Sequence, residues 1–159
     1  MSSHQALASR QHRISFAWAS ADDLEDLVAL RIEAMRESLE RMGLFNPVRA
    51  RERLANGFSP AHTRHILSEG QRAGFFVLKP TNGALLLDHL YIRPGFQRQG
   101  VGAAALALVC EEADAAGFPV RLGALRQSDA NRFYQRHGFN QVDEGEWDIY
   151  YVRLPRTGV

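Results

Sequence analysis

The sequence is poor in cysteine, in long apolar runs and in excess charge of either sign. Cys110 is the only cysteine, so no disulfide can form within the chain, and a reducing, cytoplasmic compartment fits best. The longest apolar run, Val101 to Cys110, is far shorter than the roughly 20 residues that a membrane-spanning helix needs. The net charge of +1 argues against a nucleic acid as the main partner.

The chain is nevertheless long and apolar enough to build a packed core. It has 159 residues, of which 45% are hydrophobic, and this length is typical of a single domain. It contains no internal repeat, no low-complexity linker and no apolar segment near its start that resembles a secretory signal. We therefore expect one domain over residues 13–155, with a disordered leader (residues 1–12) and a short tail (residues 156–159).

Apolar periodicity and turn residues predict the order of the secondary-structure elements. Steps of three or four residues between apolar positions from Leu24 to Met42 predict a long helix, with Arg31 on its polar face. Ser20 and Asp23 form a capping box before this helix, and Gly43 ends it. Three further helices are expected. One begins at Pro47 with Asn46 as its cap, one ends at Gly117, and one spans Ser128–His137 with Ser128 as its cap. The expected strands are Ile14–Trp18, His62–Gly70, Arg72–Pro80, Ala84–Ile92, Val120–Leu125, Phe139–Val142 and Trp147–Leu154. This order predicts an α/β (α+β) protein with a mixed sheet and helices on both faces.

One stretch, IRPGFQRQGVGAAALALVCEEA (residues 92–113), joins an apolar strand to an alanine-rich helix. Arg98, Gly100 and Gly102 lie where the helix begins. A helix N-terminus offers backbone N–H groups and the positive end of its dipole, and glycines let a bulky anion approach them. The pattern predicts a phosphate or pyrophosphate site, although a tight turn alone also explains the glycines. Neither the dinucleotide fingerprint G-x-G-x-x-G nor the P-loop triplet G-K-[ST] occurs.

Two sequence motifs, which follow each other along the chain, support a more specific prediction than the glycine loop alone. Q-x-x-G-x-G (residues 97–102) follows LDHLYIRP, and NRFYQRHGF (residues 131–139) comes later on a predicted helix. Together they resemble the GCN5-related N-acetyltransferase (GNAT) superfamily, and the resemblance covers about Ile14 to Leu154. It implies a mixed, mostly antiparallel sheet with a splayed central strand pair. It also implies transfer of the acetyl group of acetyl-CoA to an amine-bearing small molecule or peptide, by direct attack in a ternary complex without a metal.

The resemblance also implies which residues bind acetyl-CoA. Backbone groups of Leu90, Tyr91 and Ile92 would pair with the pantetheine arm. Asn131 would lie near the pantetheine or the leaving group, and Tyr134 near the thioester sulfur. The pyrophosphate would bind the loop formed by Gln97, Arg98, Gln99, Gly100, Val101, Gly102 and Ala103.

Catalytic roles follow from the same resemblance. The backbone N–H of Leu90 would stabilise the oxyanion, and Tyr134, a phenol with an ordinary pKa of about 10, would protonate the thiolate. Asp88 is the first candidate for the base. His89, on the opposite face of its strand together with Tyr91, has the better intrinsic pKa of about 6.5, and a chain of waters is a third possibility. Without a catalytic role, Tyr134 is a core aromatic, Asp88 a hydrogen-bonded strand residue and His89 a packing histidine.

The acceptor and the alternatives to catalysis stay open at this point. In this superfamily acceptor contacts usually come from the first two helices and the last strand pair, so candidates by location are Arg31, Glu33, Met35, Ser38, Trp147, Asp148 and Tyr150. Shared sheet edges make a homodimer compatible with the resemblance. The pair His62 and His65 is not expected to bind metal, because residues three apart on a strand face opposite sides. Rival functions are a non-catalytic acyl-CoA sensor of the same fold and a nucleotide or nucleic-acid binder that uses the glycine loop.

Overall fold

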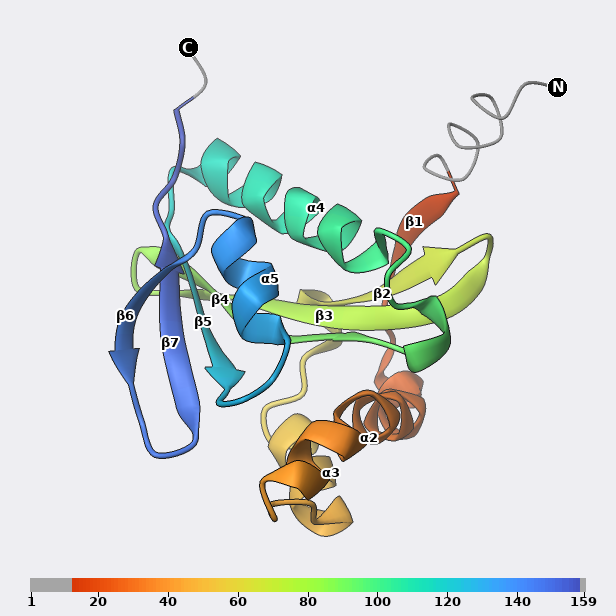
Figure 1. Ribbon diagram of the computed structural model, residues 1–159. Helices are drawn as coiled ribbons and strands as arrows, with labels where there is room; N and C mark the ends of the chain where they lie inside the picture. The colour runs from red at the N-terminus through yellow and green to blue at the C-terminus, as the bar shows by residue number, and fades with distance from the viewer. Residues whose placement is uncertain (1–12, 158–159) are drawn as a thin grey trace, which may run out of the picture. The chain divides into compact units, whose positions relative to one another are not determined.

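The computed structural model describes residues 13–157, so the expected leader (residues 1–12) and residues 158 and 159 of the expected tail lie outside it. Within this range the strands form a mixed, mostly antiparallel sheet with the order β1-β2-β3-β4-β5-β7-β6 (Figure 1). The strands are β1 (Ile14–Trp18), β2 (Thr63–Ser68), β3 (Gln71–Thr81), β4 (Ala84–Ile92), β5 (Val120–Leu125), β6 (Asn140–Glu144) and β7 (Asp148–Arg153). The helices are η1 (Ala21–Asp23), α2 (Leu24–Arg41), α3 (Pro47–Ala55), η2 (Pro60–His62), η3 (Pro94–Phe96), α4 (Val101–Ala116) and α5 (Ala130–Arg136).

The element order confirms the prediction from periodicity and turn residues. Each expected strand and helix is present, and the differences lie at the ends of the elements. Asn46 caps α3, because its Oδ1 accepts hydrogen bonds from the backbone N–H of Val48 at 3.0 Å and of Arg49 at 3.3 Å. The short pieces η1, η2 and η3 were not expected, since a single turn of 3₁₀-helix leaves no apolar period in the sequence.

The described chain divides into two compact units. The first contains residues 13–77 and 89–105, which include β1, β2, α2, α3, η3 and the end of β4. The second contains residues 78–88 and 106–157, which include β5, β6, β7, α5 and most of α4. In the second unit β4 and β5 are parallel, with Leu85 opposite Val120 and Leu86 opposite Arg121.

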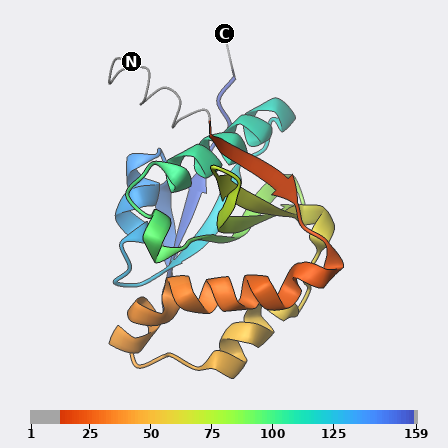
Figure 2. The same ribbon diagram turned by 90° about the vertical axis from the view of Figure 1, so that its right-hand side faces the viewer.

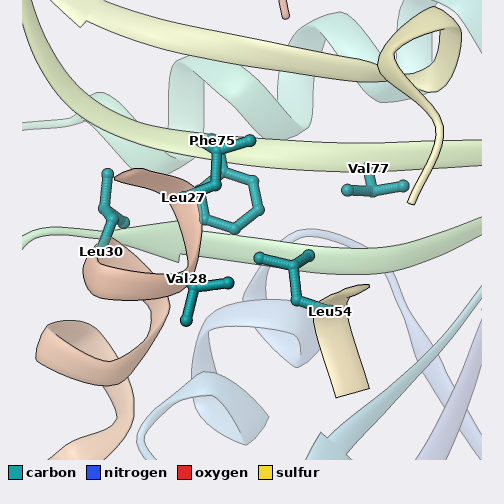
Figure 3. Close-up of a cluster of buried hydrophobic side chains, with 6 residues drawn as sticks. All are labelled: Leu27, Val28, Leu30, Leu54, Phe75 and Val77. Atoms are coloured by element: carbon teal, nitrogen blue, oxygen red, sulfur yellow. The ribbon is translucent and has the colours of Figure 1, made fainter. Parts of the chain in front are cut away.

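An apolar cluster holds the helices of the first unit against its strands. Figure 2 shows α2 running beneath these strands, with α3 beside it. Burying one large aliphatic or aromatic side chain stabilises a fold by about 1.5–3 kcal/mol, so several together determine how the helices pack. The cluster consists of Leu27, Val28 and Leu30 from α2, Leu54 from α3, and Phe75 and Val77 from β3 (Figure 3).

The buried face of α2 differs from the predicted stripe, and Arg31 is the main correction. Of the stripe residues only Val28 is buried, whereas Leu27, Leu30 and Arg31 are buried beside it. Arg31 was assigned to the polar face, yet it is only 8% exposed. Because α2 packs against α3 as well as against the strands, more of its circumference is covered than one apolar stripe predicts.

The predicted capping box forms at η1, the turn directly before α2, and its Asp23 also belongs to an ionic cluster. The backbone N–H of Ser20 donates to Oδ2 of Asp23 at 2.8 Å. The same carboxylate lies 2.8 Å from Nε2 of His65 and 3.1 Å from Nη2 of Arg72. The hydrogen bond from Ser20, and then that from His65, hold the pKa of Asp23 well below its usual range. An ionised Asp23 thus ties the start of α2 to β2 and β3.

A partly buried ion pair links α4 to β7 in the second unit. Arg153 on β7 donates from Nη1 and Nη2 to the two carboxylate oxygens of Asp114 on α4, at 2.8 and 3.1 Å. The backbone N–H of Arg156 adds a third hydrogen bond at 2.9 Å. The bonds from Arg153 and then Arg156 lower the pKa of Asp114 to about 2.

Replacing Asp114 with asparagine should lower the stability of the protein in a pH-dependent way. The pKa of this carboxyl is depressed on folding from 3.8 to about 2. Its contribution is therefore present above pH 3.8 and is lost as the pH falls toward 2. Urea unfolding between pH 2 and pH 7 should show a lower midpoint for Asp114→Asn near neutral pH, and a difference from the parent that shrinks below pH 4. Glu111→Gln, an exposed change on the same helix, is the control, and parallel curves at all pH values would contradict the assignment.

Candidate functional site

In the first unit, the loop between β4 and α4 has an unusual backbone. Its turn η3 is followed by Gln97 in an extended conformation, and the φ angles of Arg98 and Gly100 are +63° and +79°. A non-glycine residue with positive φ is uncommon and is often found at functional sites. At Gly100 a Cβ atom would meet no heavy atom within 4 Å, so the glycine is required by its φ angle and not by crowding.

This geometry turns several backbone N–H groups toward one region at the start of α4. The helical hydrogen bonds begin with the N–H of Ala104, which donates to the carbonyl of Gly100 at 3.0 Å. The N–H groups of the first helical residues, from Val101 onward, have no partner inside the helix. Residues that alternate between left-handed and right-handed conformations form a concave nest that binds anions, and the helix dipole adds positive potential. The loop is therefore suited to a phosphate group, as its sequence predicts.

The two glutamine side chains of this loop bind backbone carbonyls. Nε2 of Gln97 donates to the carbonyl of Ile92 at 3.0 Å, and Nε2 of Gln99 donates to the carbonyl of Gly95 at 3.2 Å. The N–H of Gln97 is bonded to the carbonyl of Pro94 at 3.3 Å. Both side chains thus brace the loop, while Arg98 is exposed.

The end of β4 approaches β3 closely at Gly74, which the sequence analysis did not single out. A Cβ atom on this residue would overlap the carbonyl oxygen of Tyr91 and would lie 3.2 Å from Cα of Ile92. The N–H of Arg93 donates to the carbonyl of Ala73 at 2.8 Å. A glycine inside the expected strand Arg72–Pro80 is the signal that could have indicated this contact, because such glycines often mark close backbone approach.

Tyr91 and His89 point to the same side of β4, as alternation predicts, and belong to one hydrogen-bonded group. Nδ1 of His89 lies 2.8 Å from the hydroxyl of Tyr91, and Nη1 of Arg53 lies 3.1 Å from Nε2 of His89. An arginine can only donate, so Nε2 of His89 accepts and the ring proton lies on Nδ1, which donates to Tyr91. Nε of Arg31 also donates to the Tyr91 hydroxyl, at 3.0 Å. His89 is 4% exposed, so it positions Tyr91 from a buried site.

In the second unit, Asn131 is held by several partners. Its Nδ2 donates to the carbonyls of Leu125 and Ser128, each at 3.0 Å, and its Oδ1 accepts from the hydroxyl of Tyr151 at 2.8 Å. Tyr151 is 1% exposed and was missed by the sequence analysis, since nothing local distinguishes it from other strand aromatics. The expectation that Ser128 caps α5 is wrong, because Oγ of Ser128 donates to the carbonyl of Leu125 at 2.7 Å and Asp129 is the N-cap residue.

Tyr134 lies one turn after Asn131 on α5, as predicted. Its side chain is 7% exposed, and its ring packs against Phe133, Phe139 and Tyr151 with centroid distances of 5.3, 5.6 and 6.4 Å. The core-aromatic alternative therefore describes the ring, and a catalytic role rests on the hydroxyl group alone.

Asp88, His62 and His65 each contact a neighbouring polar side chain. In the second unit Oδ2 of Asp88 lies 3.6 Å from Nζ of Lys79 on the neighbouring strand β3. In the first unit Nδ1 of His62 contacts Oγ of Ser59 at 3.0 Å, and His65 contacts Asp23.

Within residues 13–157 no three His, Cys, Asp or Glu side chains are grouped to hold a metal ion. No helix in that part of the chain combines the length and the apolar character needed to cross a membrane.

Comparison with known proteins gives a family match and a set of similar folds. Residues 61–141, more than half of the chain, match the acetyltransferase (GNAT) domain. No curated protein sequence matches significantly. The Paia N-acetyltransferase from Thermoplasma acidophilum in complex with coenzyme A is 19% identical, with a TM-score of 0.73 over 89% of this chain and 98% of that one. The ribosomal-protein-S18-alanine N-acetyltransferase from Escherichia coli is 17% identical, with a TM-score of 0.67 over 91% and 96% of the two chains. An acetyltransferase from Thermus thermophilus is 22% identical, with a TM-score of 0.67 over 89% and 96%.

Proposed function

Since the chain belongs to the GNAT acetyltransferase family, we propose that it is an N-acetyltransferase that moves the acetyl group of acetyl-CoA to an amine. The observation that carries the proposal is the loop Gln97–Ala103, whose φ angles and position at the start of α4 suit a pyrophosphate. The similar enzyme from Thermoplasma acidophilum is described with bound coenzyme A, which supports the choice of donor. A cytoplasmic location is part of the proposal, and the single cysteine supports it.

In this proposal both backbone groups and side chains bind the donor. In the first unit, backbone N–H groups from Arg98 to Ala103 bind the pyrophosphate, and Arg98 adds a charged contact. The backbone of Leu90, Tyr91 and Ile92 pairs with the pantetheine arm in the manner of an added strand. In the second unit, Asn131 contacts the pantetheine or the leaving group, and its partners Leu125, Ser128 and Tyr151 keep its amide in one orientation.

The chemistry is a direct acyl transfer. The amine nitrogen attacks the thioester carbonyl carbon, a C–N bond forms, and the C–S bond breaks to release the thiolate of coenzyme A. The backbone N–H of Leu90 stabilises the oxyanion of the tetrahedral intermediate, and the Tyr134 hydroxyl gives its proton to the thiolate sulfur. Asp88 is the proposed acceptor of the amine proton, directly or through a water.

Charge reversal at Arg98 should weaken acetyl-CoA binding about tenfold or more, because hydrogen bonds to charged groups contribute about 1.5–3 kcal/mol. Calorimetric titration of the parent and of Arg98→Glu with acetyl-CoA measures this, with ATP as a competing ligand. Arg49→Glu makes the same charge change at an exposed position on α3 and should bind as the parent does. Absence of acetyl-CoA binding by folded parent protein, or equal binding by Arg98→Glu and Arg49→Glu, would remove the basis of the proposed site. Stronger binding of ATP than of acetyl-CoA would favour the nucleotide-binding alternative.

A further inference from the structure

Two arginines in the described part of the chain are buried, and they differ in their partners. Arg153 is 5% exposed and binds both carboxylate oxygens of Asp114. Arg31 is 8% exposed, and no carboxylate within residues 13–157 pairs with it. Some more exposed arginines of the same unit do have acidic partners, for example Arg72 with Asp23 at 3.1 Å. Arg31 therefore combines burial with an uncompensated charge, which is normally unfavourable.

The contacts of Arg31 orient its guanidinium without neutralising it. Nε donates to the hydroxyl of Tyr91 at 3.0 Å, and Nη1 donates to the carbonyl of Ala50 at 3.2 Å. The guanidinium carbon lies 5.5 Å from the centre of the Tyr91 ring. Both hydrogen-bond acceptors are uncharged, and both come from elements packed against α2, so the side chain is held in place for a negative group that the described protein does not supply.

One edge of the guanidinium is accessible. Among the described residues the buried side-chain polar atoms without a partner are Nδ1 of His65 and Nδ1 of His137. Nη2 of Arg31 has no protein partner there and is not among these atoms, so it reaches solvent. A planar guanidinium with a free edge is the group that binds carboxylates most specifically in proteins.

We propose that Arg31 binds the carboxylate of the acceptor, which makes the acceptor a small amino acid or a close analogue with an amine and a carboxylate in one molecule. This inference rests on the proposed N-acetyltransferase activity. Its link to that activity is Tyr91, whose hydroxyl contacts Arg31 and whose backbone belongs to the stretch of β4 assigned to the pantetheine arm. A carboxylate on Arg31 would therefore hold the acceptor near the end of β4 where the acetyl group is expected.

The test compares amino acids with their amides, which keep the amine and lack the negative charge. With acetyl-CoA as donor, the parent enzyme should show kcat/KM about tenfold or more higher for the acids, mainly through KM, as expected for a hydrogen-bonded charge. Arg31→Met should reduce kcat/KM for the acids by a similar factor and change that for the amides by less than about twofold. Arg36→Met, an exposed change on the same helix, should leave the preference intact.

Further measurements separate the possible outcomes. Acetyl-CoA titration and thermal unfolding of each variant establish that it is folded and binds the donor. If Arg31→Met does not fold, Arg31→Lys takes its place, because lysine retains the charge without the planar fork and should lower the preference for acids. Equal use of acids and amides by the parent, or a preference for aminoalkyl phosphates over amino acids, would overturn this inference and leave the acetyltransferase proposal standing. Transfer to no amine at all, by protein that binds acetyl-CoA, would overturn both and favour the acyl-CoA sensor.

Discussion

Replacing Tyr134 with phenylalanine is expected to lower kcat by about 10²–10⁴-fold, the range typical for loss of a general acid. The ring should stay in place, because it packs against Phe133, Phe139 and Tyr151 in a site that is 7% exposed and that phenylalanine fills equally well. The proposed proton donor to the departing thiolate is then lost. Steady-state kinetics with an accepted amine, together with acetyl-CoA titration, would measure kcat and donor affinity separately.

A purely structural role for the Tyr134 hydroxyl makes a different prediction. A general acid must be protonated to act, so the activity of the parent should fall at alkaline pH, and this limb of the pH profile should disappear in Tyr134→Phe. If the hydroxyl only supports the fold, the variant should unfold at a lower temperature and keep the shape of the profile. An unchanged kcat in a stable variant would show that Tyr134 is not the general acid. A water would then be the candidate proton donor.

Gly74→Ala should both destabilise the protein and weaken donor binding. The new Cβ atom would overlap the carbonyl oxygen of Tyr91 and press on Cα of Ile92, and a strand backbone cannot rotate away as a flexible side chain can. Overpacking of this kind lowers the free energy of unfolding by about 1–3 kcal/mol. The end of β4 must also move, so a ligand that pairs with the backbone of Leu90, Tyr91 and Ile92 should bind less tightly. Urea unfolding and acetyl-CoA titration measure the two effects.

Gly95→Ala is the matched control for Gly74. A Cβ atom on Gly95 would meet no heavy atom within 4 Å, and its φ angle lies outside the positive range. This variant should unfold and bind acetyl-CoA like the parent. If Gly74→Ala behaves in the same way, the close approach of β4 to β3 does not constrain the strand, and Gly74 has no part in shaping the donor site.

Local features of the sequence predicted the elements well because their causes are local. A capping side chain, a turn glycine or an alternating apolar run acts within a few residues, so Asn46, Gly43 and the strand Ala84–Ile92 could be assigned without knowledge of the fold. The loop from Gln97 to Gly102 was predicted as a phosphate site for the same reason. Its positive φ angles and its position at a helix start agree with that chemistry, while its ligand remains a proposal.

Most of the differences have another cause, since they depend on contacts between residues far apart in the chain. Ser128 is the exception: it was expected to cap α5, but its hydroxyl binds the carbonyl of Leu125, three residues earlier in the chain. The pairing of Asp114 with Arg153 on β7 joins residues 39 positions apart, and no local pattern indicates it. The sequence did not indicate a role for Tyr151 or Gly74, because the role of a buried tyrosine or a strand glycine depends on its neighbours in space.

The sequence by itself determined the order of strands and helices and the family resemblance, because these depend on short-range patterns. Only the tertiary structure decided which polar groups are buried and what compensates them. The sequence places Arg31 on the polar face of α2. In the structure, Ala50 of α3 and Tyr91 of β4 enclose its side chain and leave one edge of the guanidinium open. Burial and charge compensation are set by elements that meet in space, and no local pattern records which elements those are.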